Sequence, residues 1–326
     1  MISRDFAQKR ARILSLLRLF FAERDFLEVD TPILVKLPGM EPYLDPFQTE
    51  FVDMKGERSP MYLITSPEYA MKRLLAAHYE RIFQLGKCFR NKETGGRLHN
   101  PEFTLLEWYR AHSDYFDIMS DLESLFRFLV PDGNFVYQGM NIDVTKFERL
   151  KVVEAFEKYA GIDREVFENV DLLRIEVKKR GYALSNDASY DDVFFCIFLN
   201  EIEPKLGIRC PVILYEYPAS MASLSRLSQE NPKYAERFEL YIAGIELANA
   251  FSELNDGSEQ KSRFQDEQML RRKLGKHVYD LDEKFLEAVG KMPPSSGIAL
   301  GVDRLIMLLV NAESIGDVMF FPFVDL

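Results

Sequence analysis

The sequence has few cysteines and no long hydrophobic run, and each absence excludes a class of protein. Cys88, Cys196 and Cys210 are too few for a disulfide framework and are not spaced as metal ligands, so a reducing cytoplasm is the expected compartment. No stretch of about 18 uncharged apolar residues occurs, which argues against a membrane-spanning helix. The apolar segment near the N-terminus is interrupted by Arg12 and Arg18 and lacks a small-residue cleavage site, so we do not expect a signal peptide.

Glycine-rich phosphate loops and an excess of positive charge are missing as well. Neither G-x-x-x-x-G-K-[ST] nor G-x-G-x-x-G is present, so a nucleotide would have to be held by arginines and a metal ion. The 52 acidic residues outnumber the 41 lysines and arginines, which gives a formal net charge of −11. Bulk electrostatics therefore argue against a nucleic acid partner such as tRNA, and only a local basic groove would overcome them.

The pattern of apolar residues predicts a chain that mixes helices and strands. Of the 326 residues, 47% are apolar, which is enough for a substantial core. Periodicity and capping signals predict helices over 6–24, 66–77, 116–129, 146–160, 164–180, 190–203 and 258–274. Strands are expected at 27–31 and 61–65, along RIFQLGKCFRN and LHNPEFTLLEWYRA, and in a hairpin that turns near Gly244. Because no βαβ repeat occurs, we expect an α+β fold, with residues 115–208 as a mostly helical insertion in one domain of residues 1–326.

The stretch RNKETGGRLHNPEFTLLEWY, residues 90–109, concentrates side chains that could bind a phosphate and an amine. Arg90 at a strand end and Arg304 at the start of a helix could each grip phosphate oxygens with the planar guanidinium fork. Glu107 and Tyr109 share one strand face, where a carboxylate beside a phenol can hold an ammonium group. His99 could contact a phosphate or serve only as a structural hydrogen-bonding residue. Each of these side chains could equally be an ordinary surface residue or ion pair.

The predicted hairpin around Gly244 carries carboxylates in an otherwise apolar strand pair. Asn249, Phe251 and Glu253 follow a two-residue spacing, so they line one face of a strand. Glu239 and Glu246 are suited to bind Mg²⁺ together with phosphate oxygens, because buried charges need a partner or a metal. Glu246 and Asn249 differ in strand parity and can share a face only if a bulge or twist lies between them. The alternative is an exposed face of an antiparallel sheet.

Taken together and in this order, these segments resemble the class II aminoacyl-tRNA synthetases of the lysine type. FLEVDTP is similar to motif 1, FRN with RLHNPEFTLLEWY to motif 2, and GIALGVDRLIML to motif 3, while ELYIAGIELANAFSELND is similar to the lysine-type segment between motifs 2 and 3. The resemblance implies an antiparallel sheet flanked by helices and a homodimer formed through motif 1. It also implies a catalytic core alone, since no segment resembles an anticodon-binding domain.

TSPEYAMKRLL, YEYPASMASLSRLS and GIALGVDRL are similar in more detail to a paralogous family, the elongation factor P–(R)-β-lysine ligases. Ala299 stands where lysyl-tRNA synthetases typically have glycine, and one methyl group in a tight pocket changes which amino acid fits. The resemblance implies an enzyme that uses ATP and Mg²⁺ to activate (R)-β-lysine or lysine and transfers it to a lysine side chain of elongation factor P. The alternatives are a minimal lysyl-tRNA synthetase and a non-catalytic paralogue that senses lysine or a nucleotide.

The resemblance also assigns roles to individual residues. The ATP phosphates would contact Arg90 and Arg304, Mg²⁺ would be held by Glu239 and Glu246, and the nucleotide would lie beside Glu93, His99 and Phe103. Of the substrate's groups, the amino group nearest the carboxylate would be bound by Glu68, the distal ammonium by Glu107, Tyr109 and Glu253, and the carboxylate by Asn249. Phe251 and Ala299 would shape the pocket. The loop RNKETGGRLHN is one residue longer than the family pattern, so Lys92 could take the place assigned to Glu93.

Overall fold

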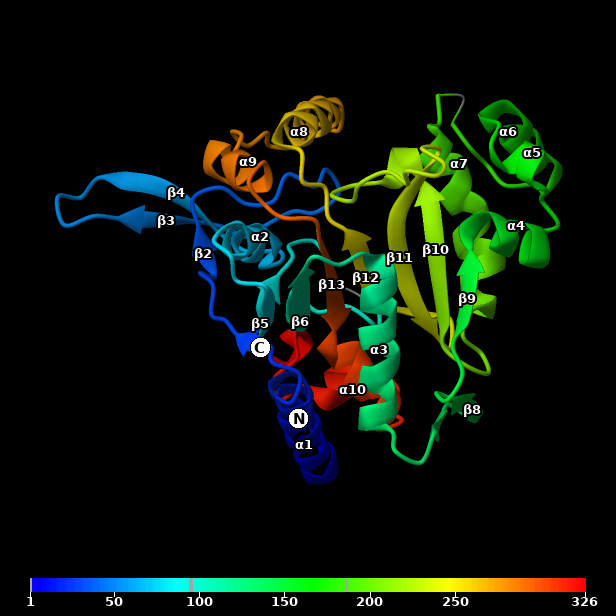
Figure 1. Cartoon of the computed structure of the whole chain (residues 1–326), viewed down its shortest axis with the longest axis horizontal. Helices are drawn as coiled ribbons and strands as arrows, with labels where there is room; N and C mark the ends of the chain where they lie inside the picture. Colours follow the sequence, from blue (N-terminus) through cyan, green and yellow to red (C-terminus); the bar gives the residue numbers. More distant parts are fainter. Residues whose placement is uncertain (1, 94–95, 186) are drawn as a thin grey trace. The chain divides into compact units, whose positions relative to one another are not determined.

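The structure is a computed structural model that describes residues 2–93, 96–185 and 187–326 (Figure 1). The chain divides into two compact units, one made of Met1–Asp114 and Glu253–Leu326, the other of Tyr115–Ser252. Each unit contains both helices and strands, which confirms the predicted α+β fold class. Within the described ranges, no helix is both long and apolar enough to cross a membrane.

The first unit is built on a mixed sheet and a small antiparallel one. The strands of the mixed sheet, in spatial order, are β1 (Leu27–Glu28), β5 (Arg81–Phe89), β6 (Glu102–Ala111) and β13 (Ser295–Gly301). β1 pairs in parallel with β5, and the other two pairs are antiparallel. The small sheet has the order β2 (Leu34–Val35), β4 (Arg58–Leu63) and β3 (Gln48–Val52), and its β3–β4 hairpin is seen as a long arm in Figure 1.

Helices of the first unit pack on its mixed sheet and on one another through aromatic side chains. They are α1 (Arg4–Ala22), α2 (Glu68–Ala76), α8 (Gly257–Lys273), α9 (Glu283–Val289) and α10 (Val302–Leu309). On α1 the buried Phe21 stacks on Phe83 of β5, with 4.7 Å between ring centroids. Tyr69 of α2 stacks on Phe285 of α9 at 4.1 Å and on Phe264 of α8 at 5.8 Å. These stacks hold α2, which carries Glu68 of the candidate site described below, against α8 and α9.

The second unit also contains a mixed sheet, with helices packed around it. Its strands, in spatial order, are β9 (Glu148–Lys151), β10 (Val212–Pro218), β11 (Tyr234–Ile242) and β12 (Ile245–Ser252). Its helices are α3 (Tyr115–Leu129), α4 (Val152–Ala160), α5 (Arg164–Phe167), α6 (Val170–Lys179) and α7 (Tyr190–Ile197), and β7 (Asn134–Tyr137) and β8 (Met140–Asp143) form a separate hairpin. Ala243 and Gly244 both have positive φ, 54° and 71°, as a two-residue hairpin turn requires.

Two of the helices expected in this unit differ from the prediction. Residues 148–151 form β9 beside β10, and helix α4 begins only at Val152. The helix starts there because Lys151 is extended and its main-chain N–H donates to the Glu154 carboxylate at 3.0 Å. The helix expected over 164–180 is divided into α5 and α6, because Asn169 accepts hydrogen bonds from two main-chain N–H groups and caps a new helix.

Candidate active site

Three buried or nearly buried carboxylates of the first unit converge on one lysine and one tyrosine. Lys72 of α2 is fully buried, and its Nζ lies 2.7 Å from Glu68 Oε1 and 2.6 Å from Glu253 Oε2. Glu107 is also fully buried and accepts a hydrogen bond from Tyr109 Oη at 3.0 Å. The sequence analysis assigned all of these residues except Lys72 to an amine-binding pocket, and the structure brings them together.

The pairing of β6 with its neighbours puts these side chains on one face of the sheet. Glu107 lies opposite Ala299 of β13, and Tyr109 lies opposite Gly297. Directly opposed residues of an antiparallel pair point to the same face, so all four positions line the same side. Ala299 is only partly buried there, although the strand around it is otherwise largely buried. The methyl group that distinguishes this position from glycine therefore stands two residues from Gly297 on the face that carries Glu107.

Gly297 occupies a position that no other residue could fill without displacing the pocket wall. A β-carbon placed on Gly297 would lie 2.2 Å from the ring of Tyr109 and 2.7 Å from Glu253 Oε1. Real β-carbons do not approach ring atoms this closely, because the repulsion is steep. The absence of a side chain at Gly297 thus lets the phenol and the carboxylate come close together. Glu253 Oε1 is buried and has no hydrogen-bond partner among the residues that the structure describes.

The pocket strongly favours positive charge. Burial, together with the neighbouring Glu68 and Glu253 carboxylates, raises the pKa of Glu107 to about 8, although hydrogen bonds from Ser66 and Tyr109 oppose the rise. Burial likewise raises the pKa of Glu253, against the attraction of the Lys72 ammonium. An ammonium ligand would reverse these shifts, because an opposite charge nearby favours the ionised carboxylate.

A small cavity adjoins Glu68 and offers room for a polar group. It has a volume of about 40 Å³, and its lining includes Gly39, Glu41, Ser66, Glu68 and Tyr69. A site of this size and polarity can hold a water molecule or an ammonium group. The cavity therefore borders Glu68, whereas Glu107, Tyr109 and Glu253 are not among its lining residues.

A second cluster of the first unit gathers the residues that the sequence analysis assigned to the nucleotide. The Arg90 guanidinium lies over the ring of Phe103, 5.1 Å from its centroid, and 3.8 Å from Glu93 Oε1. His99 Nε2 lies 3.0 Å from a terminal nitrogen of Arg304. Burial and the nearby arginine cations lower the pKa of His99, which keeps its ring neutral. The cluster combines two guanidinium groups with an aromatic face.

The lengthened loop of motif 2 lies partly outside the described residues, since residues 94 and 95 are not described. On the described side, Glu93 turns toward Arg90, while the Lys92 ammonium lies 3.2 Å from Asp45. Lys92 has a φ of 64°, so the backbone reverses at this residue. This arrangement favours Glu93 over Lys92 as the residue that accompanies Arg90.

The remaining predicted site residues line one face of the second unit's sheet. Glu239 lies opposite Asn249, and Tyr241 lies opposite Glu246. The register shifts between Leu240 and Tyr241, so β12 contains one extra residue at this point. This is the bulge that the spacing required, and it puts Glu246 and Asn249 on the same face. Phe251, opposite Arg237, shares that face.

Comparison with known proteins decides the family. The family model described as tRNA synthetases class II (D, K and N) matches residues 3–325. The chain belongs to this class II synthetase family. It is 41% identical over 325 residues to the elongation factor P–(R)-β-lysine ligase of Proteus mirabilis, covering 96% of this chain and 94% of that protein. It is 43% identical over 319 residues to the ligase of the same name from Photorhabdus laumondii, covering 96% and 93%. The ligase of Haemophilus influenzae is 39% identical over 315 residues, again covering 96% and 93%.

The carboxylates of this class II chain can be tested for a magnesium ion. Glu239 Oε2 accepts hydrogen bonds from the hydroxyl groups of Tyr217 and Tyr241, and Glu239 Oε1 accepts one from Arg237. A carboxylate has about four lone-pair sites, so one remains for another ligand. Glu246 is only partly buried on the same face, and the buried Asn249 Oδ1 has no hydrogen-bond partner in the described part of the chain. The described residues contain no group of three metal-binding side chains. Two carboxylates are nevertheless sufficient where substrate phosphates and water complete the shell, so Glu239 and Glu246 fit Mg²⁺.

Sequence reasoning missed several residues that organise this class II site. Lys72 and Ser66 were not singled out, although both lie in TSPEYAMKRLL, where Lys72 follows Glu68 by one helical turn. Ser66 Oγ donates to Glu107 Oε1 at 2.7 Å and accepts from the main-chain N–H of Glu68 at 3.0 Å. Asp303 is buried beside Arg304, where it accepts from Arg10 of α1 at 2.7 Å. No local signal marks this ion pair, because its partners are 293 positions apart.

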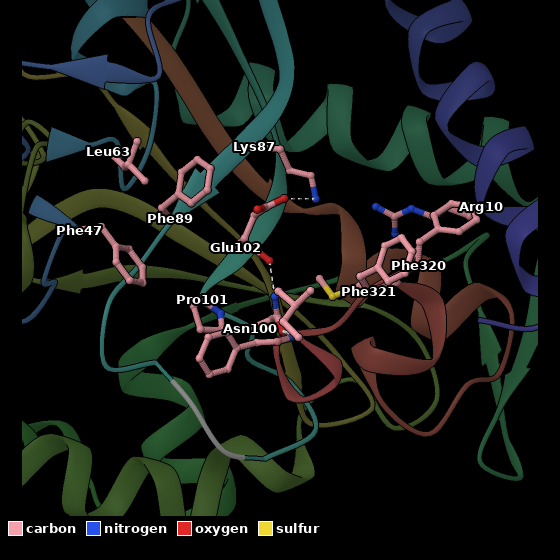
Figure 2. A pocket seen from close by; sticks show the side chains of 13 residues that line it. Arg10, Phe47, Leu63, Lys87, Phe89, Asn100, Pro101, Glu102, Phe320 and Phe321 are labelled. Carbon is pink, nitrogen blue, oxygen red and sulfur yellow. Dashed lines mark hydrogen bonds and ion pairs between the residues drawn. The ribbon is translucent and has the colours of Figure 1, made fainter. Parts of the chain in front are cut away.

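A larger groove lies elsewhere in the first unit and is mainly apolar (Figure 2). It has a volume of about 500 Å³ and is lined largely by aromatic and aliphatic side chains from β4, β5 and the C-terminal segment. Its polar residues are partly paired, since Lys87 lies 3.2 Å from Glu102 and Asn100 donates to the Glu102 carbonyl. None of the predicted site residues lines it. The cluster of buried polar side chains around Glu107, rather than this larger groove, is therefore the candidate active site.

Proposed function

We propose that the chain is an ATP-dependent ligase that activates (R)-β-lysine, or lysine, and transfers it to a lysine side chain of elongation factor P. The observation that carries this function is the buried cluster in which Glu68 and Glu253 share the single cation of Lys72, while the neighbouring Glu107 has no cation in contact with it among the described residues. A pocket with an excess of carboxylates suits a substrate with two ammonium groups. The ligase name of relatives about 40% identical supplies the acceptor protein.

In the first step, a carboxylate oxygen of the amino acid attacks the α-phosphorus of ATP, and diphosphate leaves. Arg90 and Arg304 hold the phosphates and stabilise the charge that develops on them, while Phe103 stacks on the adenine and Glu93 and His99 line the nucleotide site. Glu239 and Glu246 are the proposed ligands of Mg²⁺, which neutralises phosphate charge when bound. No covalent intermediate on the enzyme is needed.

In the second step, the deprotonated amine of the acceptor lysine attacks the carbonyl carbon of the aminoacyl-adenylate. The carbon–oxygen bond to AMP breaks, an amide forms, and the amine loses a proton. Glu68 holds the amino group nearest the reacting carbonyl. Glu107, Tyr109 and Glu253 hold the distal ammonium in both steps, while Asn249 binds the carboxylate before it is activated. Phe251 and Ala299 restrict the shape of the amino acid.

We also propose that the chain acts as a homodimer and that its family core forms a single catalytic domain. The family model spans residues of both compact units, which supports one catalytic domain. Exposed apolar side chains lie on α1 and in the segment after it, as a subunit interface through motif 1 would require; they are Leu19, Leu27, Ile33 and Leu34. Light scattering at micromolar concentration should give twice the 37.9 kDa chain mass. A monomeric mass contradicts the dimer.

A transfer assay tests the proposed function. The protein is mixed with ATP, Mg²⁺ and labelled (R)-β-lysine or lysine, and with either elongation factor P or lysine tRNA. We expect label on elongation factor P, more from (R)-β-lysine than from lysine, together with one AMP for each amide. Arg304→Ala should abolish AMP formation while leaving the thermal unfolding temperature close to that of the parent. Label on tRNA would favour a minimal synthetase, and no AMP with either amino acid would favour a sensor.

A further inference from the structure

Lys72 is a buried cation that the proposed reaction does not use. Its side chain is fully buried, whereas the other lysines that form i, i+4 ion pairs among the described residues, Lys9 and Lys291, are half exposed or more. Burying a charge is costly unless it is paired, and Lys72 is paired with both Glu68 and Glu253. Burial by itself would lower the pKa of Lys72, but the Glu253 and Glu68 carboxylates outweigh it and raise the pKa, so the ammonium form persists at neutral pH.

The two carboxylates that Lys72 joins come from distant parts of the chain and have fixed backbones. The main-chain N–H of Glu68 is bonded to Ser66 Oγ at 3.0 Å, in the first turn of α2. The main-chain N–H of Glu253 donates to the carbonyl of Ser295 in β13 at 2.8 Å. Only side-chain torsions remain to be set, and the shared ammonium sets them by holding one oxygen of each carboxylate. Both oxygens contact the same nitrogen, Lys72 Nζ, at 2.7 and 2.6 Å, so the distance between the two oxygens cannot exceed the sum of these two contacts.

The wall beside Glu253 leaves that carboxylate little room to move. Glu253 Oε1 and the ring of Tyr109 both crowd the position where Gly297 lacks a side chain. Glu253 Oε1 has no hydrogen-bond partner among the described residues, so one oxygen serves Lys72 and the other remains available to a ligand. When Glu68, Glu107 and Glu253 are all ionised, these three carboxylates and the Lys72 ammonium have a net charge of −2. This charge matches a substrate with two ammonium groups.

We infer that Lys72 is a positioning residue that fixes the separation between the two ammonium sites and thereby selects the spacing of the substrate's two amino groups. The inference rests on the proposed function, in which Glu68 binds the nearer amino group and Glu253 the distal one. (R)-β-lysine and ornithine have the same length of carbon chain between their amino groups, and lysine has one carbon more. Carboxylates held at a fixed separation distinguish these lengths, whereas mobile carboxylates adapt to either.

The test compares binding of (R)-β-lysine, ornithine and lysine by calorimetry, followed by AMP formation with each. Lys72→Arg keeps the charge but moves the donor atoms, Lys72→Met removes the charge, and Lys291→Met is a control that breaks an exposed i, i+4 pair with Glu287. We expect the parent to bind (R)-β-lysine and ornithine more tightly than lysine. Both Lys72 variants should reduce this preference for (R)-β-lysine and ornithine over lysine about tenfold or more. The change should come chiefly through KM, since one methylene group is worth about 10- to 200-fold in a fitted pocket. Lys291→Met should change nothing.

Each outcome decides the question. If the Lys72 variants weaken binding of all three amino acids by the same factor, Lys72 has only a structural role and the inference is wrong. If Lys72→Met does not fold, Lys72→Arg, which retains a cation, must still reduce this preference for (R)-β-lysine and ornithine over lysine. Spacing-dependent binding without AMP formation or transfer would overturn the proposed function but leave the role of Lys72 intact. A parent protein that binds none of the three amino acids would overturn both.

Discussion

The pKa of Glu107 makes the proposed amine pocket sensitive to pH in a direction that can be predicted. In the empty pocket this carboxyl has a pKa of about 8, so about nine in ten molecules carry it protonated at pH 7. An ammonium ligand binds the ionised form, and binding below pH 8 must therefore release a proton. The distal ammonium of the substrate keeps its charge throughout this range, since its ordinary pKa is about 10.4.

The size of the effect follows from the fraction of ionised Glu107. The apparent kcat/KM for the amino acid should rise about tenfold per pH unit below pH 8 and level off above it, a change of about ninety-fold between pH 6 and pH 9. The same pKa shift predicts how the stability of the ligand-free protein depends on pH. Because the pKa of Glu107 is higher in the folded protein than in the unfolded chain, the stability that Glu107 contributes is complete below about pH 4.5 and is lost as pH rises toward 8. Added amino acid should therefore raise the unfolding temperature more at pH 8.5 than at pH 6.5.

The assay is AMP formation at saturating ATP across pH 6 to 9, with the amino acid well below its KM. Glu107→Gln keeps the size of the side chain but cannot ionise, so its profile should be less steep than that of the parent. Its plateau should lie about ten- to a hundred-fold below the parent, the value of a charge-assisted hydrogen bond of roughly 1.5–3 kcal/mol. Glu267→Gln is the matched control: burial and the neighbouring Glu41 and Glu68 carboxylates also raise the pKa of Glu267 on α8 to about 8, but Glu267 is not among the groups that shift the pKa of Glu107. It should keep the slope of the parent.

Two results would refute the reasoning. A parent profile that is level between pH 6 and 8 would mean that the empty pocket already holds Glu107 ionised. A Glu107→Gln variant that keeps the parent slope would assign the titration to another group, of which Glu253, whose pKa is also raised by burial, is the nearest candidate.

Three further substitutions test the structure around the site. Ala299→Gly should raise kcat/KM for lysine relative to (R)-β-lysine by about tenfold, because it removes a methyl group from the pocket; an unchanged ratio of AMP formation would contradict this role. Gly297→Ala should lower stability by about 1–3 kcal/mol in thermal denaturation and abolish amino acid binding, because its methyl group would meet the Tyr109 ring at 2.2 Å, and normal binding would be inconsistent with this geometry. Arg10→Met should cost about 3–5 kcal/mol in urea denaturation by leaving Asp303 buried without its cation, and Arg10→Met with Asp303→Asn should recover part of this loss.

The fold could be predicted where its signals are local. Helical periodicity located α1 and α8 to within a few residues, and the Gly244 turn located the β11–β12 hairpin. Strand β9 could not be predicted in this way. Its four residues continue the apolar spacing of the following helix, and only the pairing with β10, more than 60 positions away, makes them extended.

In the candidate site too, the sequence predicts what local spacing determines and not what long-range packing determines. The two-residue spacing of Glu107 and Tyr109 was enough to place them on one strand face, where the structure has them hydrogen-bonded. The burial of Lys72 could not be read from the sequence, because an i, i+4 pair with a glutamate is also typical of an exposed helix. What buries Lys72 is Glu253, 181 positions later in the chain, together with the packing of α2 on β6.

The bulge in β12 also determines how related chains should be aligned here. Leu247 is the extra residue: without it, Glu246 would pair with Tyr241 in a regular ladder and still lie on the face of Asn249. A relative that lacks one residue at this point would keep both polar side chains where they are and lose only a buried leucine. A relative with one residue more would have to turn one of them to the other side of the sheet. A single-codon gap opposite Leu247 is thus compatible with an intact ligand face, whereas a single-codon insertion is not.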